Sequence, residues 1–436
     1  MRPTGRLHIG HYFGALANWI RLQNDSTYEC FYFVADWHAL TSDYADPSQI
    51  ASNTIEIVTD WLAVGLDPAK SIFFVQSQVP EHAELHLLLS MITPLGRLYS
   101  LPSYKEQLEN IKDKDLQTYG FLGYPVLQCA DIVIYSETGS DLVVPVGEDQ
   151  KSHVELSREI VRRANFCYAF NLRADLFEPK NRQSLRAILE LYAMAKLLPV
   201  TQGVLDQQTI TEIRGVLLGD AKDGGIRNFV EKIGPENRRF VVDQEILTEP
   251  DALLTETPRI PGLDGRKMSK SYGNAIMLSE DDESIRAKTK VMVTDPARKR
   301  RTDPGNPDIC PVYDWHKLFS PPETLDWSAH GCRTAGIGCI ECKAAMADNL
   351  IKWITPVRAR RQQYEAHPEK VREILADGSK KARKVAQATM ERVRQAVFGA
   401  TVISSSNTVS IASDVGPAAK PSAGKPSAAK PSGAGN

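Results

Sequence analysis

The feature that most constrains the fold of this 436-residue chain is a pair of short motifs that lie far apart in the sequence. His8-Ile9-Gly10-His11 stands near the start, and Lys267-Met268-Ser269-Lys270-Ser271 stands well past the middle. Apolar spacing after the first motif predicts that its histidines open a helix, whose unpaired N–H groups suit a phosphate. The lysines stand among turn residues, which predicts a loop that can close on a departing pyrophosphate. Together the motifs indicate ATP activation by adenylate transfer.

Each motif alone also has a plainer interpretation. His8 and His11 could be surface or capping histidines, and the two lysines could belong to a solvated basic loop. Finding both motifs in this order favours the interpretation in which they hold one nucleotide between them.

Strand and helix patterns alternate along the first part of the chain. Short, continuous apolar runs predict buried strands of a parallel sheet, and longer amphipathic patterns between them predict helices. We therefore predict an α/β fold with a doubly wound, Rossmann-like parallel sheet. The expected strands are residues 30–36, 71–76 and 142–145, and the expected helices are residues 47–64, 81–92, 124–135 and 148–163.

Composition divides the chain into five expected parts. The last is too poor in large apolar residues to fold, so a disordered tail is predicted there. The parts are the first section of the catalytic domain at 1–165, a mainly helical insertion at 166–256, the return of the catalytic domain with the lysine loop at 257–281, a basic helical domain at 282–400 and the low-complexity tail at 401–436.

The formal net charge of -2 hides a basic region. Residues 343–394 carry thirteen lysines and arginines against six acidic residues, and Arg298-Lys299-Arg300-Arg301 lies upstream. Such density indicates contact with nucleic acid or, at similar odds, a solvated helix face. We find no apolar run of membrane-spanning length and no signal peptide, so we expect a cytoplasmic protein without a membrane partner.

Four of the seven cysteines form one spaced group, Cys310-x21-Cys332-x6-Cys339-x2-Cys342. Four thiolates with a tight final pair are typical of a zinc or [4Fe–4S] site. Unligated thiols are the alternative, and an odd number of cysteines argues against a disulfide framework.

Several segments in order resemble bacterial tryptophanyl-tRNA synthetases, enzymes of class I. The resemblance covers residues 2–164 and about 250–400. It implies ATP-dependent attachment of L-tryptophan to tRNA(Trp) through a tryptophanyl-adenylate, with Mg²⁺, a helical anticodon-binding domain, a homodimer and no DNA partner. The segments are Pro3-Thr4-Gly5-x-x-His8-x-Gly10-His11, Asp36-Trp37-His38-Ala39, Tyr124-Pro125-Val126-Leu127-Gln128-x-Ala130-Asp131, Val144 to Lys151 and Lys267 to Ser271.

The resemblance also implies roles for individual residues. His8, His11, Lys267 and Lys270 are expected to stabilise the transition state of adenylate formation. Asp131 is expected to accept a hydrogen bond from the indole N–H, which suits a carboxylate that only accepts; a buried carboxylate satisfied by backbone donors is the alternative. The expected ATP-binding residues are Arg2, Pro3, Thr4, Gly10, His11, Gly147, Glu148, Asp149, Ile260, Lys267, Met268, Ser269, Lys270 and Ser271, and His38, Tyr124 and Gln150 are expected beside Asp131 in the tryptophan pocket.

Two further expectations follow from the resemblance. A subset of the family carries a similar four-cysteine motif that holds [4Fe–4S], so an iron–sulfur cluster is favoured over Zn²⁺ at Cys310, Cys332, Cys339 and Cys342. Family members also begin with a short hydrophobic strand, whereas here Met1 adjoins Arg2 and Pro3, so a sheet without that strand or a start further upstream is expected.

Other functions remain as alternatives. A non-charging paralogue could bind tRNA or regulate in response to tryptophan, although it would be expected to have lost His11, Asp131 or Lys270. A small-molecule nucleotidyltransferase would lack the lysine loop and the basic helical domain. A tyrosine-specific relative is disfavoured by the apolar context of Asp131.

Overall fold

The computed structural model describes residues 1–102, 104–106, 116–198, 203–254 and 260–399, and Met1–Val397 form one compact unit. The tail predicted at 401–436 lies outside the described residues. None of the helices that are described is both long and apolar enough to cross a membrane.

Parallel strand pairs form the centre of the catalytic region. β1 (Cys30–Val34) pairs in parallel with β2 (Ser71–Val75), and β3 (Leu142–Val146) pairs in parallel with β6 (Pro250–Leu254). α3 (Asp36–Asp43) and α4 (Ile50–Val64) connect β1 to β2, as expected for a parallel crossover. This confirms the α/β prediction, although the strands form separate pairs rather than one continuous ladder.

Helices then cover the strands in the predicted order. α5 (Glu81–Ser90) follows β2, α6 (Leu95–Tyr99) comes next, and α9 (Lys151–Ala164) follows β3. The buried helix α8 (Tyr119–Val133) begins earlier than its apolar pattern predicts, because the Thr118 side chain caps it by accepting a hydrogen bond from the backbone N–H of Phe121.

The chain after the histidine motif is helical, as predicted. It consists of α1 (Ile9–His11), the π-helical turn η1 (Tyr12–Leu16) and α2 (Ala17–Gln23). Met1 lies along the edge of β1, where its ammonium donates to the Phe33 carbonyl oxygen at 2.6 Å and its own carbonyl accepts from the Ala35 N–H at 2.8 Å.

The inserted region contains helices and a small antiparallel pair. Its helices are α10 (Arg182–Leu191), α11 (Gln207–Gly224) and α12 (Ile226–Ile233), and β4 (Phe170–Leu172) pairs with β5 (Val241–Asp243). Its apolar side chains pack with one another into a separate cluster, which includes Leu176, Leu185, Ile213, Leu217 and Phe229.

The helical region after the lysine loop is also as predicted. It comprises α13 (Asp282–Lys290), α14 (Pro311–Phe319), α15 (Pro322–Arg333), α16 (Cys339–Glu365) and α17 (Pro368–Phe398). The shorter 3-10 or π turns are η2 (Gln76–Gln78), η3 (Glu148–Gln150), η4 (Asn165–Ala169), η5 (Ala174–Phe177), η6 (Pro179–Asn181), η7 (Ala195–Leu197), η8 (Pro235–Phe240), η9 (Lys270–Tyr272) and η10 (Pro307–Ile309).

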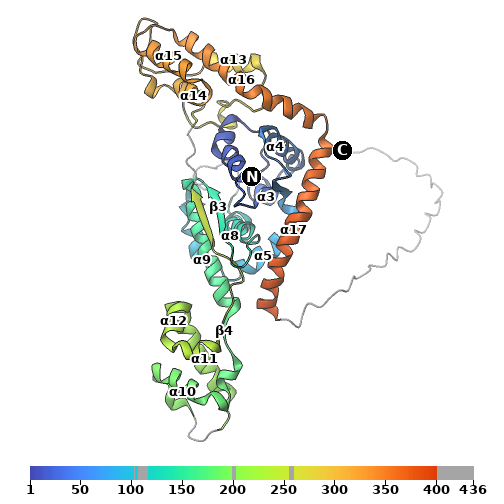
Figure 1. The fold of residues 1–436 in the computed structure, drawn as a ribbon, viewed down its shortest axis with the longest axis vertical. Helices are drawn as coiled ribbons and strands as arrows, with labels where there is room; N and C mark the ends of the chain where they lie inside the picture. Colours follow the sequence, from blue (N-terminus) through green and yellow to red (C-terminus); the bar gives the residue numbers. More distant parts are fainter. Residues whose placement is uncertain (103, 107–115, 199–202, 255–259, 400–436) are drawn as a thin grey trace, which may run out of the picture. The chain divides into compact units, whose positions relative to one another are not determined.

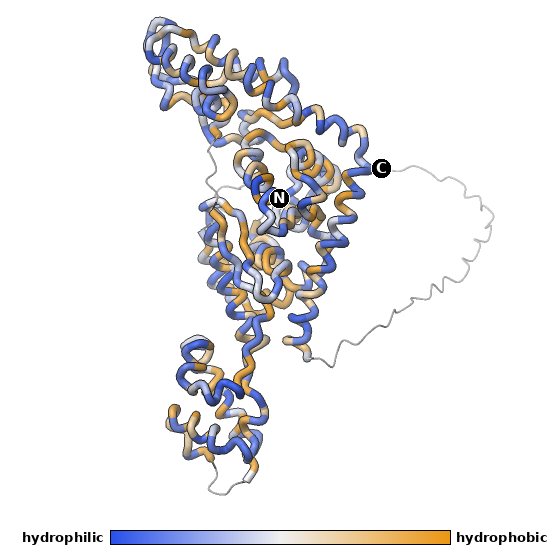
Figure 2. The backbone as a smooth tube through the Cα atoms, viewed as in Figure 1, coloured by the Kyte–Doolittle hydropathy of each residue, from blue (hydrophilic) through white to orange (hydrophobic). Residues whose placement is uncertain are grey.

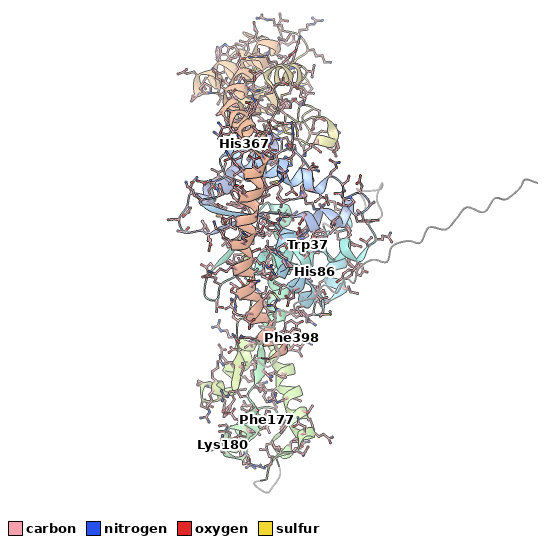
Figure 3. The ribbon with its side chains drawn as sticks, turned by 90° about the vertical axis from the view of Figure 1, so that its right-hand side faces the viewer. Trp37, His86, Phe177, Lys180, His367 and Phe398 are labelled. Carbon is pink, nitrogen blue, oxygen red and sulfur yellow. The ribbon has the colours of Figure 1, made fainter. Side chains whose placement is uncertain are left out.

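α17 lies along the catalytic region and is packed against it (Figure 1). Figure 2 shows hydrophilic and hydrophobic residues interspersed along this helix, and Figure 3 labels His367, which directly precedes it, and Phe398, its last residue. Its buried face includes Val371, Leu375, Ala382, Ala386, Met390 and Val393. On the same helix Arg383 pairs with Glu81 at 2.9 Å and Arg394 pairs with Glu84. Some of the basic residues for which the sequence predicted contact with nucleic acid or solvent therefore form ion pairs that fix this helix to α5.

Candidate active site

The histidine motif forms a neutral pair of imidazoles, of which His8 is buried and His11 is half-buried. The ring centroids of His8 and His11 are 3.7 Å apart, and His11 Nδ1 accepts a hydrogen bond of 3.2 Å from the His8 backbone N–H. Burial lowers the pKa of His8 to about 4 and that of His11 to about 3. Both rings are therefore uncharged near neutral pH, and the His11 proton belongs on Nε2, where it can be donated to a phosphate oxygen.

The lysine loop contacts the histidine motif directly. Lys270 Nζ donates to the Thr4 carbonyl oxygen at 2.6 Å, and burial lowers the pKa of this lysine. A Cβ on Gly10 would lie 3.3 Å from the Met268 sulfur and 2.9 Å from His8 Nδ1, so the glycine is what permits this close approach. The structure thus brings together the two motifs that the sequence placed on one nucleotide.

Asn274 organises the lysine loop, and the sequence analysis missed it. Its buried Oδ1 accepts from the Ser269 N–H at 2.7 Å, and its Nδ2 donates to Asp264 Oδ1 at 2.7 Å and to the Lys267 carbonyl oxygen at 3.1 Å. The hydroxyls of Ser269 and Ser271 are 2.8 Å apart. The sequence signal for this role is an asparagine directly after the turn glycine Gly273.

Most of the other predicted ATP residues lie around the same two motifs. The Arg2 guanidinium lies 3.4 Å from the hydroxyls of Thr41 and Ser42 on α3. Pro3 is buried, and Ile260 packs in the same apolar core as Met268. Gly147 and Glu148 stand instead at the end of β3, where Gly147 precedes η3, and the side chain of Asp149 lies outside the described part of the structure.

Asp131 lies buried in a cage of polar side chains. His38 Nε2 is 2.7 Å from Oδ2, His82 Nδ1 is 2.6 Å from Oδ1, and Gln76 Nε2 lies 2.7 and 2.9 Å from the two oxygens. Burial alone would raise the pKa of this carboxyl, but the hydrogen bonds and charges of the two histidines outweigh it and hold the pKa below its usual range. The hydrogen-bond donors described around the Asp131 carboxylate are side chains. The alternative interpretation, a carboxylate satisfied by backbone donors, expected backbone N–H groups instead.

The remaining predicted pocket residues are less closely joined to Asp131. The ring of Tyr124 lies edge-on to that of His38 with centroids 6.3 Å apart, and its hydroxyl is 3.3 Å from His153 Nε2. Gln150 ends η3 and is half-buried. Gln76 and His82 were not predicted from the sequence as partners of Asp131. Both nevertheless follow the carboxyl end of β2, the edge at which α/β sheets bind ligands.

The four spaced cysteines gather in the helical region. Burial raises the pKa of Cys342 to about 12, and the charges of Cys310, Cys332 and Cys339 contribute to the rise. Arg298 lies 3.8 Å from the Cys332 sulfur. Within the described ranges, however, no three histidine, cysteine or acidic side chains are arranged to hold a metal ion.

Comparison with known proteins identifies the family. A family model described as tRNA synthetases class I (W and Y) matches residues 1–190 and 227–355. The chain belongs to this class I synthetase family. The family match omits residues 191–226, which lie within the range 166–256 that the sequence predicted to be an insertion.

Individual relatives of this synthetase match along nearly its whole length. A tryptophan–tRNA ligase from Ralstonia nicotianae is 48% identical over 402 residues, covering 91% of this chain and 96% of the relative. A tryptophan–tRNA ligase from Thermotoga maritima is 42% identical over 398 residues, with 91% and 97% covered. The solved structure of tryptophanyl-tRNA synthetase from Campylobacter jejuni, complexed with ADP and tryptophan, superposes with a TM-score of 0.66 at 26% identity, covering 91% of this chain and 97% of that one. The predicted α/β fold is therefore the fold of solved family members.

Proposed function

We propose that this protein is a tryptophan–tRNA ligase. It joins L-tryptophan to tRNA(Trp) through a tryptophanyl-adenylate, releases pyrophosphate and AMP, and works in the cytoplasm. The observation that carries the proposal is the meeting of the two motifs, in which Lys270 Nζ lies 2.6 Å from the Thr4 carbonyl oxygen beside the histidine pair. The identity to tryptophan–tRNA ligases supports tryptophan as the amino acid.

Adenylate formation needs positioning and charge stabilisation more than a protein base. A tryptophan carboxylate oxygen attacks the α-phosphorus of ATP, the bond from that phosphorus to the bridging oxygen breaks, and pyrophosphate leaves with the electron pair. His8 and His11 donate N–H groups and Lys267 and Lys270 supply positive charge where negative charge develops. Mg²⁺ accompanying ATP would supply further neutralisation of the phosphates.

The second step transfers tryptophan to tRNA. A terminal ribose hydroxyl of the tRNA attacks the adenylate carbonyl, loses its proton, and AMP leaves. The basic helical region, residues 282–400, is the proposed anticodon-binding part. Its exposed lysines Lys370, Lys380 and Lys384 are available for phosphate contacts, unlike Arg383 and Arg394, which pair within the protein.

Asp131 is the proposed source of amino-acid specificity. An indole N–H can replace one of the present donors, of which His38 stands on the separate helix α3. A phenylalanine side chain has no donor, so the carboxylate would lose a hydrogen bond without compensation, at a cost of about 1 to 3 kcal/mol or more.

The test is amino-acid-dependent ATP–pyrophosphate exchange. Tryptophan is expected to support exchange, whereas tyrosine and phenylalanine are expected to give at most about a hundredth of its rate. Asp131→Asn should raise the KM for tryptophan at least tenfold, because the amide can no longer act as a purely accepting, charged partner. Absence of tryptophan-dependent exchange would contradict the proposal. Exchange without charging of tRNA(Trp) would instead favour the non-charging paralogue.

A homodimer is proposed from an exposed apolar patch. Leu87 on α5, Met91 directly after it, Leu95 and Tyr99 on α6, and Tyr119 at the start of α8 are each at least half exposed. Such a patch suits an interface between copies of the chain. Sedimentation should give a dimer, and Met91→Glu should weaken it while Val204→Glu, at another exposed apolar residue, should not. A monomeric wild type would contradict the proposal.

An iron–sulfur cluster is proposed at Cys310, Cys332, Cys339 and Cys342, with Zn²⁺ as the alternative. The residues fit such a group in chemistry, since thiolates are the usual ligands of iron–sulfur clusters and the cations Arg298 and Lys343 interact electrostatically with these cysteines. The bound cluster would brace the helical region rather than take part in aminoacylation. Anaerobically purified protein should contain about four irons and sulfides per chain with a visible absorbance shoulder. One equivalent of zinc would favour the alternative, and neither metal would contradict both.

A further inference from the structure

A buried pair of opposite charges lies directly behind the histidine motif. Asp60 on α4 has an exposed fraction of 0% and Arg361 on α16 has one of 1%. Arg361 donates to Asp60 Oδ1, and Asp60 Oδ2 accepts a hydrogen bond of 2.6 Å from the backbone N–H of Leu7. Leu7 is the residue before His8, so the carboxylate acts on the backbone that carries the first catalytic imidazole.

The same short segment is held on its other side by the chain that leaves the lysine loop. The Ile9 N–H donates to the Ile276 carbonyl oxygen at 3.0 Å, and the Leu278 N–H donates to the Leu7 carbonyl oxygen at 2.9 Å. These bonds hold the Leu7 carbonyl and the Ile9 amide, whereas the Leu7 amide is held by Asp60. Without Asp60 that amide would be buried with no acceptor, and the turn into His8 would lose one of its restraints.

Arg361 belongs to a helix that reaches far from the ATP site. α16 begins at Cys339 and Cys342, in the four-cysteine group, and its 27 residues span about 40 Å. Near its other end, Arg358 donates to the Glu280 carbonyl oxygen at 2.9 Å and Arg360 donates to the Ala63 carbonyl oxygen at 2.6 Å. One helix of the region that the sequence assigned to tRNA is thus fastened to both sides of the nucleotide-binding turn.

The charged groups around Asp60 come from four parts of the chain. On α16, Arg361 also pairs with Glu365 at 3.1 Å. On α4, Glu56 accepts from Arg361 and from Arg6, the latter at 2.9 Å. The ammonium of Lys270 interacts electrostatically with Asp60.

We propose that Asp60 is a positioning residue for the nucleotide-binding turn, that Arg361 keeps it ionised and oriented, and that α16 thereby takes part in adenylate formation. The kinetic test of this inference rests on the proposed function, because it measures tryptophan-dependent ATP–pyrophosphate exchange. Asp60 does not touch substrate; it acts through the Leu7 amide on His8. Loss of Arg361 should lower kcat for exchange and leave the KM for tryptophan within about twofold, because the Asp131 pocket is built from other elements.

The pH profile separates this role from simple packing. Burial raises the pKa of Asp60 to about 6, and the Arg361 charge and the Leu7 N–H oppose that rise. In Arg361→Gln the carboxyl should therefore protonate at higher pH, and the acid limb of the exchange profile should move upward by about one unit or more, giving a loss of about threefold or more at pH 6.5. Arg361→Lys keeps the charge and should restore most of the profile.

Arg360→Gln is the matched control, since Arg360 is the neighbouring residue and also bonds to α4 but does not contact Asp60. It should keep the wild-type profile. Asp60→Asn cannot titrate and should remove the acid limb near pH 6, so it decides the question if Arg361→Gln does not fold. A wild-type profile in folded Arg361→Gln, or an unchanged acid limb in Asp60→Asn, would overturn the inference.

Deuterium exchange in the full chain tests the positioning without any catalytic assay. Arg361→Gln should increase uptake in a peptide covering residues 6–12, whereas Arg360→Gln should not. Unchanged uptake in both variants would overturn the inference even if exchange activity is present. If the wild type gives no tryptophan-dependent exchange, the proposed function fails, and the deuterium measurement still decides the role of Asp60.

Discussion

Gly378 allows α17 to lie against the edge of β2, and replacing it should separate the two elements. A Cβ at this position would lie 1.8 Å from the Phe73 carbonyl oxygen and 2.7 Å from its carbonyl carbon. Because that oxygen belongs to the backbone of a strand, it cannot rotate away, and in Gly378→Ala the helix must move by more than about 1 Å.

The size of the effect follows from three contributions. Overpacking costs about 1 to 3 kcal/mol. Moving the helix also breaks the bonds of its neighbour Ser379, which donates to Gln78 Oε1 at 2.6 Å and accepts from the Val75 N–H at 3.5 Å, at about 1 kcal/mol each. Alanine gains about 1 kcal/mol of helix propensity in return. The net expectation is a loss of about 2 to 4 kcal/mol of unfolding free energy.

Urea denaturation followed by circular dichroism measures the change, and deuterium uptake in α17 locates it. Gly215→Ala on α11 is the matched control, because a Cβ there meets nothing within 4 Å and only the propensity gain remains. The control should therefore stabilise its helix by about 1 kcal/mol. If Gly378→Ala is as stable as wild type, or resembles the control, the packing of α17 on β2 is not as described.

Three further outcomes are expected. Because burial holds the pKa of His8 at about 4 and that of His11 at about 3, the unfolded chain binds more protons below pH 6.5. Stability should consequently fall from pH 7 to pH 5, and His11→Gln should reduce that fall by about 1 kcal/mol in urea titrations at both values; an equal fall would contradict the burial of His11. Asn274→Ala leaves the Ser269 N–H without its acceptor and removes one donor from Asp264, so kcat for exchange should drop about tenfold with the KM for tryptophan unchanged, and a pure KM effect would contradict its role in the lysine loop. Lys270→Ala should lower kcat by about a hundredfold or more, while Lys270→Arg retains part of the rate; full activity of the alanine variant would exclude Lys270 from transition-state stabilisation.

The element order was predictable because each element carries its own local signal. The apolar runs at β1 and β2 and the helical periods at α4, α5 and α9 need no distant partner to be recognised. Asp131 was noticeable for the same reason, as the one charge in the apolar helix α8. The strand pairs were harder, because the register of β3 against β6 depends on residues on both sides of the insertion.

The basic residues near the C-terminus show what a local sequence pattern does not predict, which is the partner of each charged side chain. Thirteen lysines and arginines in residues 343–394 look alike in sequence, whether they face water, RNA or another helix. Only the structure separates Arg361, which lies buried against Asp60, and Arg383 and Arg394, which pair with α5, from the exposed lysines beside them.

By itself, then, the sequence determined the α/β class, and it singled out the two motifs and Asp131 as candidate site residues, since each is carried by a short stretch of residues. The tertiary structure alone decided that Gln76 and His82 surround Asp131, that Asn274 closes the lysine loop, and that Asp60 and Arg361 stand behind His8. Asp60 and Arg361 show the physical reason most clearly. A buried charge is recognised by the partner that compensates it, and here that partner lies 301 positions away in the chain.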